Sequence, residues 1–361
     1  MKVAILCPRT PRLNYGGLEN YTMRLAGRLC SKGEQVEIYT TSSDPKNYVA
    51  GKIKVREFGV FAPNESYFFS LPAFFELQKS DADIIYSVGY NNLLTFAGIL
   101  AKKRGQKFVV SINLSGEPPG IRKVLNFFYD VAMNLLATRI DAVVCVSEYE
   151  LSTFRKRLWA VGADKFSIVP MGIDIEPIKK VKAGKKGNYI LSAGRFVRVK
   201  EFHNLIPSFE IVAKKIPGIK LVLLGSGPME GQLREMAKKS RVSDRIIFEK
   251  SVPLERISEL HKKMKESQMF VNLVDCGYEG IISYDAIACE VPVLLCDRKG
   301  KLEYVEKGYA QAITNPQDHV EVGAKIIEML KNPAKYTPKN PKIHSWDEIA
   351  QRMHSLFKGV L

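Results

Sequence analysis

Short apolar runs alternate with helix-length amphipathic segments along the whole chain, and this alternation limits the possible folds more than any other feature. In the first half, the apolar runs occupy residues 3–7, 35–40, 83–88, 107–112, 141–146 and 166–169. Between the first two runs, Leu18, Leu25 and Leu29 recur at the spacing of one helix face. Continuous apolar strands that alternate with helices form a parallel sheet covered on both faces. The first half is therefore predicted to be a doubly wound α/β domain.

The second half repeats the same pattern and predicts a second domain of the same kind. Its apolar runs occupy residues 188–194, 219–227, 245–248, 269–274, 291–296 and 310–314. Residues 177–187, PIKKVKAGKKG, are basic and without periodicity, which is typical of a linker. A chain of 361 residues is long enough for two domains that each bury a core. We predict an N-terminal domain over 1–174, a linker over 175–187, a C-terminal domain over 188–340 and a tail over 341–361.

Two doubly wound domains are expected to bind ligands at the carboxyl ends of their strands, in one cleft between the domains. The chain carries 54 Lys and Arg against 38 Asp and Glu, a formal charge of +16. This charge favours an anionic partner, such as a phosphate-rich ligand, nucleic acid or an acidic membrane surface. The basic residues are dispersed over both halves, and no nucleic-acid-binding module is recognised. Nucleic acid is therefore not expected as a partner.

The remaining composition is typical of a cytosolic protein that is soluble or peripheral to a membrane. Apolar residues make up 46% of the chain. The longest apolar stretch, 124–146, is interrupted by charged and polar residues and is not expected to span a membrane. The N-terminus leads directly into an expected strand, without a targeting segment. We expect reduced, buried thiols, because no CxxC pair occurs among Cys7, Cys30, Cys145, Cys276, Cys289 and Cys296.

Glycine-containing turns follow several of the expected strands, and two of them suit a phosphate ligand. Gly16 and Gly17 open the first helix, where the backbone could approach an anion, although a tight turn alone would also need glycine. No GxGxxG motif is present, so a dinucleotide site is not indicated. Gly194 is followed by Arg195 and Lys200, and two cations at a strand end suit a pyrophosphate.

A third glycine-containing turn, and an acidic pair, complete the candidate features at strand ends. The LGSGP turn places Gly225 and Gly227 at a strand end, where they could line a nucleotide. Asp81 and Asp83, in contrast, precede a strand, on the amino side of the sheet and away from the expected site. They are interpreted as a polar start to that strand, so metal-independent chemistry is expected.

Taken in order, the motifs resemble those of a known enzyme family. The segments are YGGLEN, CVSEYE, IVPMGID, SAGRFVRVKEF, LVLLGSGP, DRIIF, YEGIISYDAIACEVPVL and HSWDEIA. The series resembles the retaining nucleotide-sugar glycosyltransferases of family 4, which have the GT-B architecture, and the resemblance covers nearly the whole chain. It implies a hexosyltransferase-type enzyme that uses a nucleotide sugar, with a UDP-sugar as first candidate, and no cofactor. It also implies that the tail helix crosses back to the first domain.

The resemblance assigns roles in donor binding to the stretch around YEGIISYD. Glu279 is expected to hold the donor sugar and Asp285, shortened from the usual Glu, the ribose hydroxyls. Gly280, Ile281 and Ile282 would contact the donor between these carboxylates. In the family, seven residues separate the two carboxylates, whereas five separate Glu279 from Asp285. The assignment of Glu279 therefore requires a two-residue deletion after it relative to the family. The alternative is that Glu279 has no ligand and is only a carboxylate near a helix N-terminus, where the helix dipole favours negative charge.

The first domain departs from the family at one position. Members commonly carry a His after the strand that corresponds to 107–112, and this chain has Asn113 at the matching place. Asn can donate a hydrogen bond to a sugar hydroxyl but carries no proton charge. The resemblance implies that Arg195, Lys200 and the amides of Gly16 and Gly17 stabilise the leaving diphosphate. Its oxygen would then assist deprotonation of the acceptor on the same face.

The acceptor is expected to meet the first domain and to be a glycan, plausibly lipid-linked. Residues 64–79 are dense in aromatics, and Arg122 and Lys123 precede Phe127 and Phe128 in an amphipathic segment. Aromatics beside basic residues suit contact with an anionic membrane on its cytosolic side. The alternative is that these aromatics form part of the core.

Two other functions remain open from the sequence. A nucleotide-sugar epimerase could share the two-domain architecture, although its reaction would require acid and base groups in the cleft. A catalytically degenerate protein that binds a nucleotide sugar or a partner subunit would explain Asn113 and the shortened carboxylate spacing.

Overall fold

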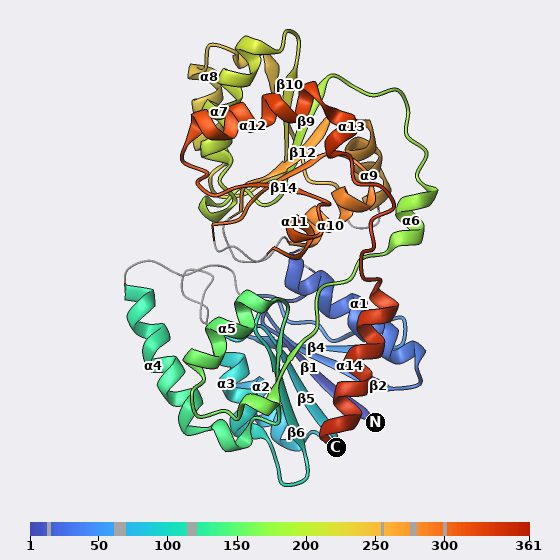
Figure 1. The fold of residues 1–361 in the computed structure, drawn as a ribbon. Coiled ribbons are helices and arrows are strands. Elements are labelled where there is room, and N and C mark those ends of the chain that lie inside the picture. Colours follow the sequence, from blue (N-terminus) through green and yellow to red (C-terminus); the bar gives the residue numbers. More distant parts are fainter. Residues whose placement is uncertain (13–15, 61–69, 114–120, 254–255, 275–279, 299–301) are drawn as a thin grey trace. The chain divides into compact units, whose positions relative to one another are not determined.

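The computed structural model describes residues 1–361 except 13–15, 61–69, 114–120, 254–255, 275–279, 299–301 and the side chains of 121–122. The chain divides into two compact units, which are drawn in Figure 1. Unit 1 comprises Met1–Gly172 and His344–Leu361, and unit 2 comprises Ile173–Ile343.

Unit 1 is an α/β unit whose strands form a single sheet within the described residues. Its strands are β1 (Lys2–Cys7), β2 (Gln35–Ser42), β3 (Tyr48–Ala50), β4 (Ile53–Gly59), β5 (Ile84–Val88), β6 (Lys107–Ser111), β7 (Ala142–Cys145) and β8 (Phe166–Ile168). Its helices are α1 (Gly17–Ser31), α2 (Leu71–Lys79), α3 (Leu93–Ala101), α4 (Ile121–Leu135), α5 (Glu148–Arg157) and α14 (Trp346–Val360). The strand order is β3-β4-β2-β1-β5-β6-β7-β8, and only the pairing of β3 with β4 is antiparallel among the described strands.

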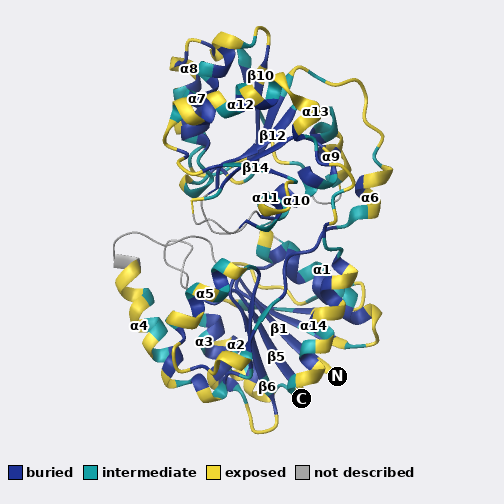
Figure 2. Cartoon of the chain, viewed as in Figure 1, coloured by how far each residue is buried: buried dark blue, intermediate teal, exposed yellow. Residues whose placement is uncertain are grey.

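The central strands of unit 1 are buried on both faces, as the continuous apolar runs predict. Figure 2 shows them in dark blue, whereas the covering helices turn an exposed face outward. Ile5 and Leu6 of β1 and Ile84 and Tyr86 of β5 are fully buried. The doubly wound α/β fold expected for the first half is confirmed, although the sequence prediction missed strands β3 and β4. In β4, exposed Lys54 alternates with buried neighbours, so no continuous apolar run marks the strand.

The last helix packs in unit 1, although its residues follow unit 2 in the sequence. Ser345 caps α14, because its side chain accepts from the Glu348 amide while the Glu348 side chain accepts from the Ser345 amide. Phe357 of α14 packs edge-on against Tyr86 of β5, with ring centroids 5.3 Å apart. Helix α14 therefore completes the cover of the unit 1 sheet beside α1 (Figure 1).

Unit 2 has a second parallel sheet, covered by helices on both faces. Its strands are β9 (Tyr189–Ala193), β10 (Lys220–Leu224), β11 (Ile246–Glu249), β12 (Met269–Asn272), β13 (Val293–Cys296) and β14 (Gln311–Ile313). Its helices are α6 (Ile175–Lys180), α7 (Phe202–Lys215), α8 (Glu230–Lys239), α9 (Ile257–Glu266), α10 (Ile281–Ala288), α11 (Glu303–Glu306), α12 (His319–Lys331) and α13 (Pro333–Tyr336). The strand order is β11-β10-β9-β12-β13-β14.

The segment interpreted as a linker, 175–187, begins with helix α6 and lies wholly in unit 2. Ile178 of α6 is buried, and α6 packs against α10 and α9. The Lys186 ammonium donates to the Ser267 carbonyl oxygen at 2.7 Å. The segment is therefore attached to unit 2 along much of its length.

Five of the six cysteines lie among the described residues, and each is buried with a free thiol, as expected. Cys276 lies outside the described residues. No helix in the described ranges combines the length and apolarity needed to cross a bilayer.

Candidate functional site

Each parallel sheet has a topological switch point, where the order in which the chain adds strands reverses from one side of the sheet to the other. Ligands of such sheets bind at this point, beyond the carboxyl ends of the strands. In unit 2, this point lies between β9 and β12, and β10 flanks β9. The segments that follow β9, β10 and β12, including the first turns of α10, carry all of the donor-binding residues that the sequence predicts in this unit. These residues are Gly194, Arg195, Lys200, Gly225, Gly227, Gly280, Ile281, Ile282 and Asp285. The fold of unit 2 therefore brings these segments to one edge of one sheet.

The loop after β9 presents the two predicted cations at this edge. Arg195 is exposed and Lys200 is partly exposed. Lys200 lies in a short 3-10 helix, Arg198–Lys200, and its side chain passes over Gly194. A Cβ atom at Gly194 would lie 3.9 Å from the Lys200 Cδ and Cε atoms, and the Gly194 φ of +151° favours glycine. The turn thus brings the lysine stem back over the strand end.

The two glycines after β10 have a packing role. A Cβ atom at Gly225 would lie 2.0 Å from the Gly194 carbonyl oxygen, and one at Gly227 would lie 2.6 Å from that of Phe196. The Phe196 amide donates to the Ser226 carbonyl oxygen at 2.8 Å, which joins the two loops. Gly225 and Gly227 therefore allow the loops after β9 and β10 to pack backbone against backbone.

Helix α10 follows β12 and carries the second predicted carboxylate. Gly280 adopts φ +76°, which favours glycine, and its carbonyl oxygen accepts from the Ser283 amide at 3.0 Å. Ile281 and Ile282 form the first turn, where amides have no acceptor within the helix. Asp285 is partly buried, with 13% of its side chain exposed. Glu279, the predicted sugar-binding carboxylate, lies outside the described residues.

In unit 1, the two glycines at the start of α1 have different surroundings. A Cβ atom at Gly16 would lie 2.2 Å from Glu19 Oε2, whereas one at Gly17 would meet no atom of the described residues within 4 Å. Glu19 is buried and pairs with Arg9 at 2.7 Å between Oε1 and Nε. Gly16 therefore makes room for this ion pair, and Gly17 leaves the backbone open. The sequence analysis missed Arg9, whose signal is its position two residues after the end of β1.

Asn113 lies two residues after the end of β6 and is buried. It adopts φ +49°, and its Nδ2 donates to the Ser111 hydroxyl at 2.6 Å. The Asn113 Oδ1 is also buried, with no hydrogen-bond partner in the described structure. A hydroxyl-bearing ligand would supply the missing donor.

The aromatic residues predicted for the acceptor side lie on the outer face of α4. Phe127 is 64% exposed and Phe128 is 63% exposed, so the alternative that the aromatics form part of the core is wrong for these two residues. It is right for Tyr129 of α4 and Phe74 of α2, which pack against the core. Lys123 is exposed on the same helix, and the Arg122 side chain lies outside the described residues. Of the aromatic stretch 64–79, Leu71 and Phe75 of α2 are exposed, and 64–69 are not described.

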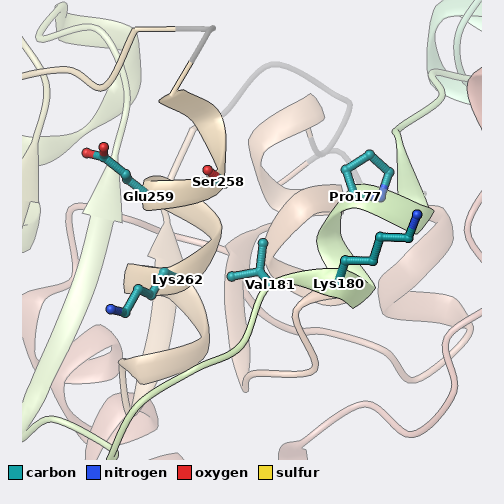
Figure 3. Close-up of a pocket in the computed structure, with 6 residues that line it drawn as sticks. All are labelled: Pro177, Lys180, Val181, Ser258, Glu259 and Lys262. Atoms are coloured by element: carbon teal, nitrogen blue, oxygen red, sulfur yellow. The ribbon is translucent and has the colours of Figure 1, made fainter.

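A shallow pocket of about 380 Å³ lies within unit 2 between α6 and α9 (Figure 3). Lys180 and Val181 line one side, and Ser258, Glu259 and Lys262 the other. The ammonium groups of the two lysines point away from one another (Figure 3). The Glu259 carboxylate already accepts two hydrogen bonds from Arg256. The pocket contains no residue of the predicted site and no convergent set of polar groups.

Asp81 and Asp83 lie at the start of β5 and bind Lys2. The Lys2 amide donates to Asp83 Oδ2 at 2.7 Å, and the Lys2 ammonium pairs with Asp81. The interpretation of these residues as a polar start to the strand is therefore confirmed. In the described ranges, no group of three or more His, Cys, Asp or Glu side chains is arranged to hold a metal ion.

Two family models match consecutive parts of the chain and together cover most of it. Residues 15–177 match Glycosyltransferase Family 4, and residues 174–353 match Glycosyl transferases group 1. The chain is a group 1 glycosyltransferase. The boundary between the two matches falls close to that between units 1 and 2.

Curated relatives of the transferase are distant. Mannosylfructose-phosphate synthase of Agrobacterium fabrum is 22% identical over 256 residues, covering 66% of this chain and 55% of that protein. GDP-mannose-dependent alpha-(1-6)-phosphatidylinositol monomannoside mannosyltransferase of Mycolicibacterium smegmatis is 23% identical over 218 residues, covering 56% of each chain. The chain therefore spans about half the length of each of these relatives.

Solved structures resemble the transferase over its full length. Sucrose-phosphate synthase from Thermosynechococcus elongatus has a TM-score of 0.78 at 18% identity, covering 99% of this chain and 98% of that one. Anabaena HepE in complex with UDP and glucose has a TM-score of 0.74 at 15% identity, covering 99% of each chain. The transferase has the GT-B fold that the sequence analysis expected.

Proposed function

We propose that the enzyme transfers a hexose or a related sugar from a nucleotide sugar to a glycan, with retention at the anomeric carbon and without a metal ion. The observation that carries this proposal is the gathering of Arg195, Lys200, Gly280 and Asp285 at one edge of the unit 2 sheet. Two cations suit a diphosphate, and a carboxylate suits the two hydroxyls of a ribose. A UDP-sugar is the first candidate, because the neighbouring HepE structure contains UDP and glucose.

In the proposed reaction, the bond from the anomeric carbon to the diphosphate breaks and its electron pair leaves with the nucleoside diphosphate. Arg195 and Lys200 stabilise the negative charge that develops on the leaving oxygen. The acceptor hydroxyl oxygen bonds to the anomeric carbon from the same face, and its proton passes to the diphosphate. Glu279 holds the sugar. The family resemblance assigns Asn113 and the amides of Gly16 and Gly17 to the same reaction.

Acceptor-dependent release of nucleoside diphosphate tests the proposed transfer. The full chain is incubated with UDP-, GDP- and ADP-sugars, with EDTA, and with a panel of lipid-linked and free glycans. We expect release that needs one sugar and one acceptor, together with a product of the donor's anomeric configuration by NMR. Turnover that needs added metal would contradict metal independence, and an inverted product would contradict retention. Formation of an epimerised sugar without acceptor would contradict the proposed transfer and would identify the enzyme as an epimerase.

We further propose that the acceptor glycan is lipid-linked and that the enzyme binds peripherally to the cytosolic face of an anionic membrane. Helix α4 carries this part of the proposal, because Tyr129, Asp130 and Asn134 bind it to the rest of unit 1 through hydrogen bonds. The Tyr129 hydroxyl donates to the Tyr90 carbonyl oxygen at 2.7 Å, and Asp130 accepts from Arg157 at 2.8 Å. The amide of Asn134 donates to the Arg157 carbonyl oxygen at 2.8 Å.

The outward face of α4 is correspondingly apolar. Its exposed apolar residues are Val124, Leu125, Phe127, Phe128, Val131 and Leu135. Trp159, 72% exposed, lies next to Ala160, whose amide donates to Asn134 of α4. Exposed Lys123 supplies positive charge on α4 itself, and Arg155 and Lys156 are exposed on α5. Such a helix suits the interface of an anionic bilayer, where aromatic rings insert and cations meet headgroups.

Vesicle flotation tests the membrane part of the proposal separately from catalysis. We expect the wild type to float with vesicles of phosphatidylcholine and phosphatidylserine, and the double variant Phe127→Ser/Phe128→Ser to remain unbound. Val320→Ser, which removes an exposed apolar side chain from α12, is the matched control and should float like the wild type. Equal flotation of the double variant and the wild type would exclude α4 as the binding surface. No flotation of the wild type would exclude the membrane itself.

A further inference from the structure

A buried histidine lies against the carboxylate proposed to bind the donor ribose. His261, on α9, is 4% exposed, and neither of its ring nitrogens has a hydrogen-bond partner in the described structure. Buried polar groups are nearly always hydrogen-bonded, so an imidazole with two unsatisfied nitrogens needs an explanation. Its Nε2 atom lies 3.7 Å from Asp285 Oδ2, on the facing helix α10.

Cys289, at the end of α10, holds α9 and α10 together next to this pair, independently of any bond between the His261 and Asp285 side chains. The Cys289 thiol donates to the His261 carbonyl oxygen at 3.7 Å, and the Cys289 amide donates to the Asp285 carbonyl oxygen at 2.9 Å. Cys289 therefore ties the turn of α10 that carries Asp285 to the turn of α9 that carries His261. The imidazole and the carboxylate remain close even where no hydrogen bond joins them.

The distance of 3.7 Å is slightly too long for a hydrogen bond, and a small rotation of either side chain would close it. Asp285 keeps 13% of its side chain exposed, so its carboxylate can meet a ligand on one side and the buried imidazole on the other. Asp is also one methylene shorter than Glu, which keeps the carboxylate near the axis of α10 and within reach of α9.

We infer that His261 is a positioning residue for Asp285, and that its Nε2 proton is donated to the carboxylate when a nucleoside diphosphate binds. The inference rests on the proposed donor site and specifies what orients its ribose-binding group. His261 is too buried to touch the ligand, so it acts through Asp285 alone. A charge-assisted hydrogen bond restricts the carboxylate to the orientation that accepts both ribose hydroxyls.

This role predicts a specific effect on recognition of the ribose hydroxyls. Titration calorimetry of the full chain would give Kd values for UDP, GDP and ADP, and for the 2′-deoxy and 3′-deoxy analogues of the tightest of them. We expect the wild type to prefer the ribonucleotide, and His261→Leu to reduce that preference by ~10-fold. His261→Gln can still donate from its amide, so it should restore part of the preference. A variant that only loosened the fold would weaken the nucleotide and its analogues alike.

Met264→Leu is the matched control, because Met264 is fully buried on the same helix and its thioether has no proton to donate to the Asp285 carboxylate. It should keep the wild-type preference. A double-mutant cycle with Asp285→Asn completes the test, since His261→Gln should have no further effect in that background. This arm also decides the matter where His261→Leu fails to fold.

The outcomes separate the inference from the proposed function. No binding of any nucleoside diphosphate by the wild type would contradict the proposed donor site itself. Binding with a ribose preference that Asp285→Asn abolishes and the His261 variants retain would overturn the role of His261 alone. Loss of the preference in both, without additivity, is the expected result.

Discussion

Asn113 combines a left-handed backbone conformation with a buried amide oxygen that has no donor in the described structure. The left-handed region costs most residues roughly 1–2 kcal/mol, whereas Asn and Gly tolerate it. Strained and unsatisfied groups of this kind concentrate at functional sites. This combination supports Asn113 as a hydrogen-bonding partner of a sugar hydroxyl.

Asn113→Gly separates the side chain from the backbone conformation. Glycine adopts the same φ, so we expect the midpoint of thermal unfolding to stay within a few degrees of the wild type. Loss of the amide should lower kcat by ~10-fold or more. The control is Asn340→Gly, because Asn340 also has a positive φ, of +47°, and is exposed. An unchanged kcat in Asn113→Gly would show that the Asn113 side chain takes no part in the reaction.

Glu57 is a buried carboxylate of β4 that links separate segments of unit 1. It accepts from Arg12 at 2.9 Å, from the Lys46 amide at 2.9 Å and from the Thr10 hydroxyl. Burial alone would raise the pKa of Glu57, but these hydrogen bonds outweigh it and hold the pKa below its ordinary value. A lowered pKa in the folded state means that ionised Glu57 stabilises the fold.

This stabilisation should be fully present above the unfolded-state pKa of about 4.3 and lost as the pH falls through the lower folded-state pKa. Glu57→Gln leaves Arg12 without its buried partner and should cost about 2 kcal/mol of unfolding free energy at pH 7. Urea denaturation from pH 7 to pH 3 checks both points. We expect the difference between the two proteins to shrink with falling pH. A constant difference would show that the charge of Glu57 does not stabilise the fold.

Among individual residues, the sequence predicted those that follow strands and missed those that depend on helix packing. Arg195 and Asp285 occur in motifs with a recognisable order, so their positions at one edge of the sheet could be predicted. His261 lies 24 positions before Asp285, as the sequence numbering gives. No periodicity connects the two residues, because the packing of α9 on α10 alone brings them together.

Helix α14 is the element whose role is easiest to test. Trp346, Ile349, Met353 and Phe357 are buried on one face of it. Removal of a large buried side chain costs about 3–5 kcal/mol, because lost burial and a new cavity add together. We expect Phe357→Ala to lower the thermal midpoint clearly, whereas Lys358→Ala, on the exposed face, should leave it unchanged. Equal midpoints for the two variants would contradict the packing of α14 on unit 1.

The orientation of an amphipathic helix is harder to predict than its existence. The sequence of α4 contains apolar residues at helical spacing, and such a face normally packs on the core. The inner face of α4 buries Met133 in the core, and Tyr129, Asp130 and Asn134 also hold this face through hydrogen bonds. Each of these bonds joins α4 to a segment distant in sequence, which no local pattern reveals. Only the structure distinguishes the outward apolar face from a core face.

The net charge of +16 belongs to the whole chain and gives a prediction about salt. If cations hold the enzyme at an anionic bilayer before its aromatics insert, ionic strength should weaken binding, because the Debye length shortens from about 10 Å at 0.1 M to about 3 Å at 1 M. We expect flotation with phosphatidylserine vesicles to fall between these salt concentrations, and flotation with pure phosphatidylcholine to be weak throughout. Binding independent of both salt and lipid charge would leave the apolar face of α4 as the sole attraction.

The overall architecture could be predicted because most of the parallel strands are continuous apolar runs, whereas β4, in which exposed and buried residues alternate, was missed. The α/β fold follows from these runs, and so does the position, at the carboxyl ends of strands in unit 2, of the loops proposed to bind the donor. The identity of the base, the sugar and the acceptor does not follow, since it depends on side chains in loops rather than on repeated patterns.

Binding of nucleotide sugars to unit 2 residues is the central claim, and a thermal-shift panel tests it most directly. UDP-, GDP- and ADP-sugars and the free nucleoside diphosphates are compared, without metal, on the wild type and on Asp285→Ala and Glu279→Ala. We predict that one base stabilises the wild type, that Asp285→Ala abolishes the shift, and that Glu279→Ala removes the difference between the sugar and the free diphosphate. The absence of any shift with the wild type, or an undiminished shift with Asp285→Ala, would contradict the claim.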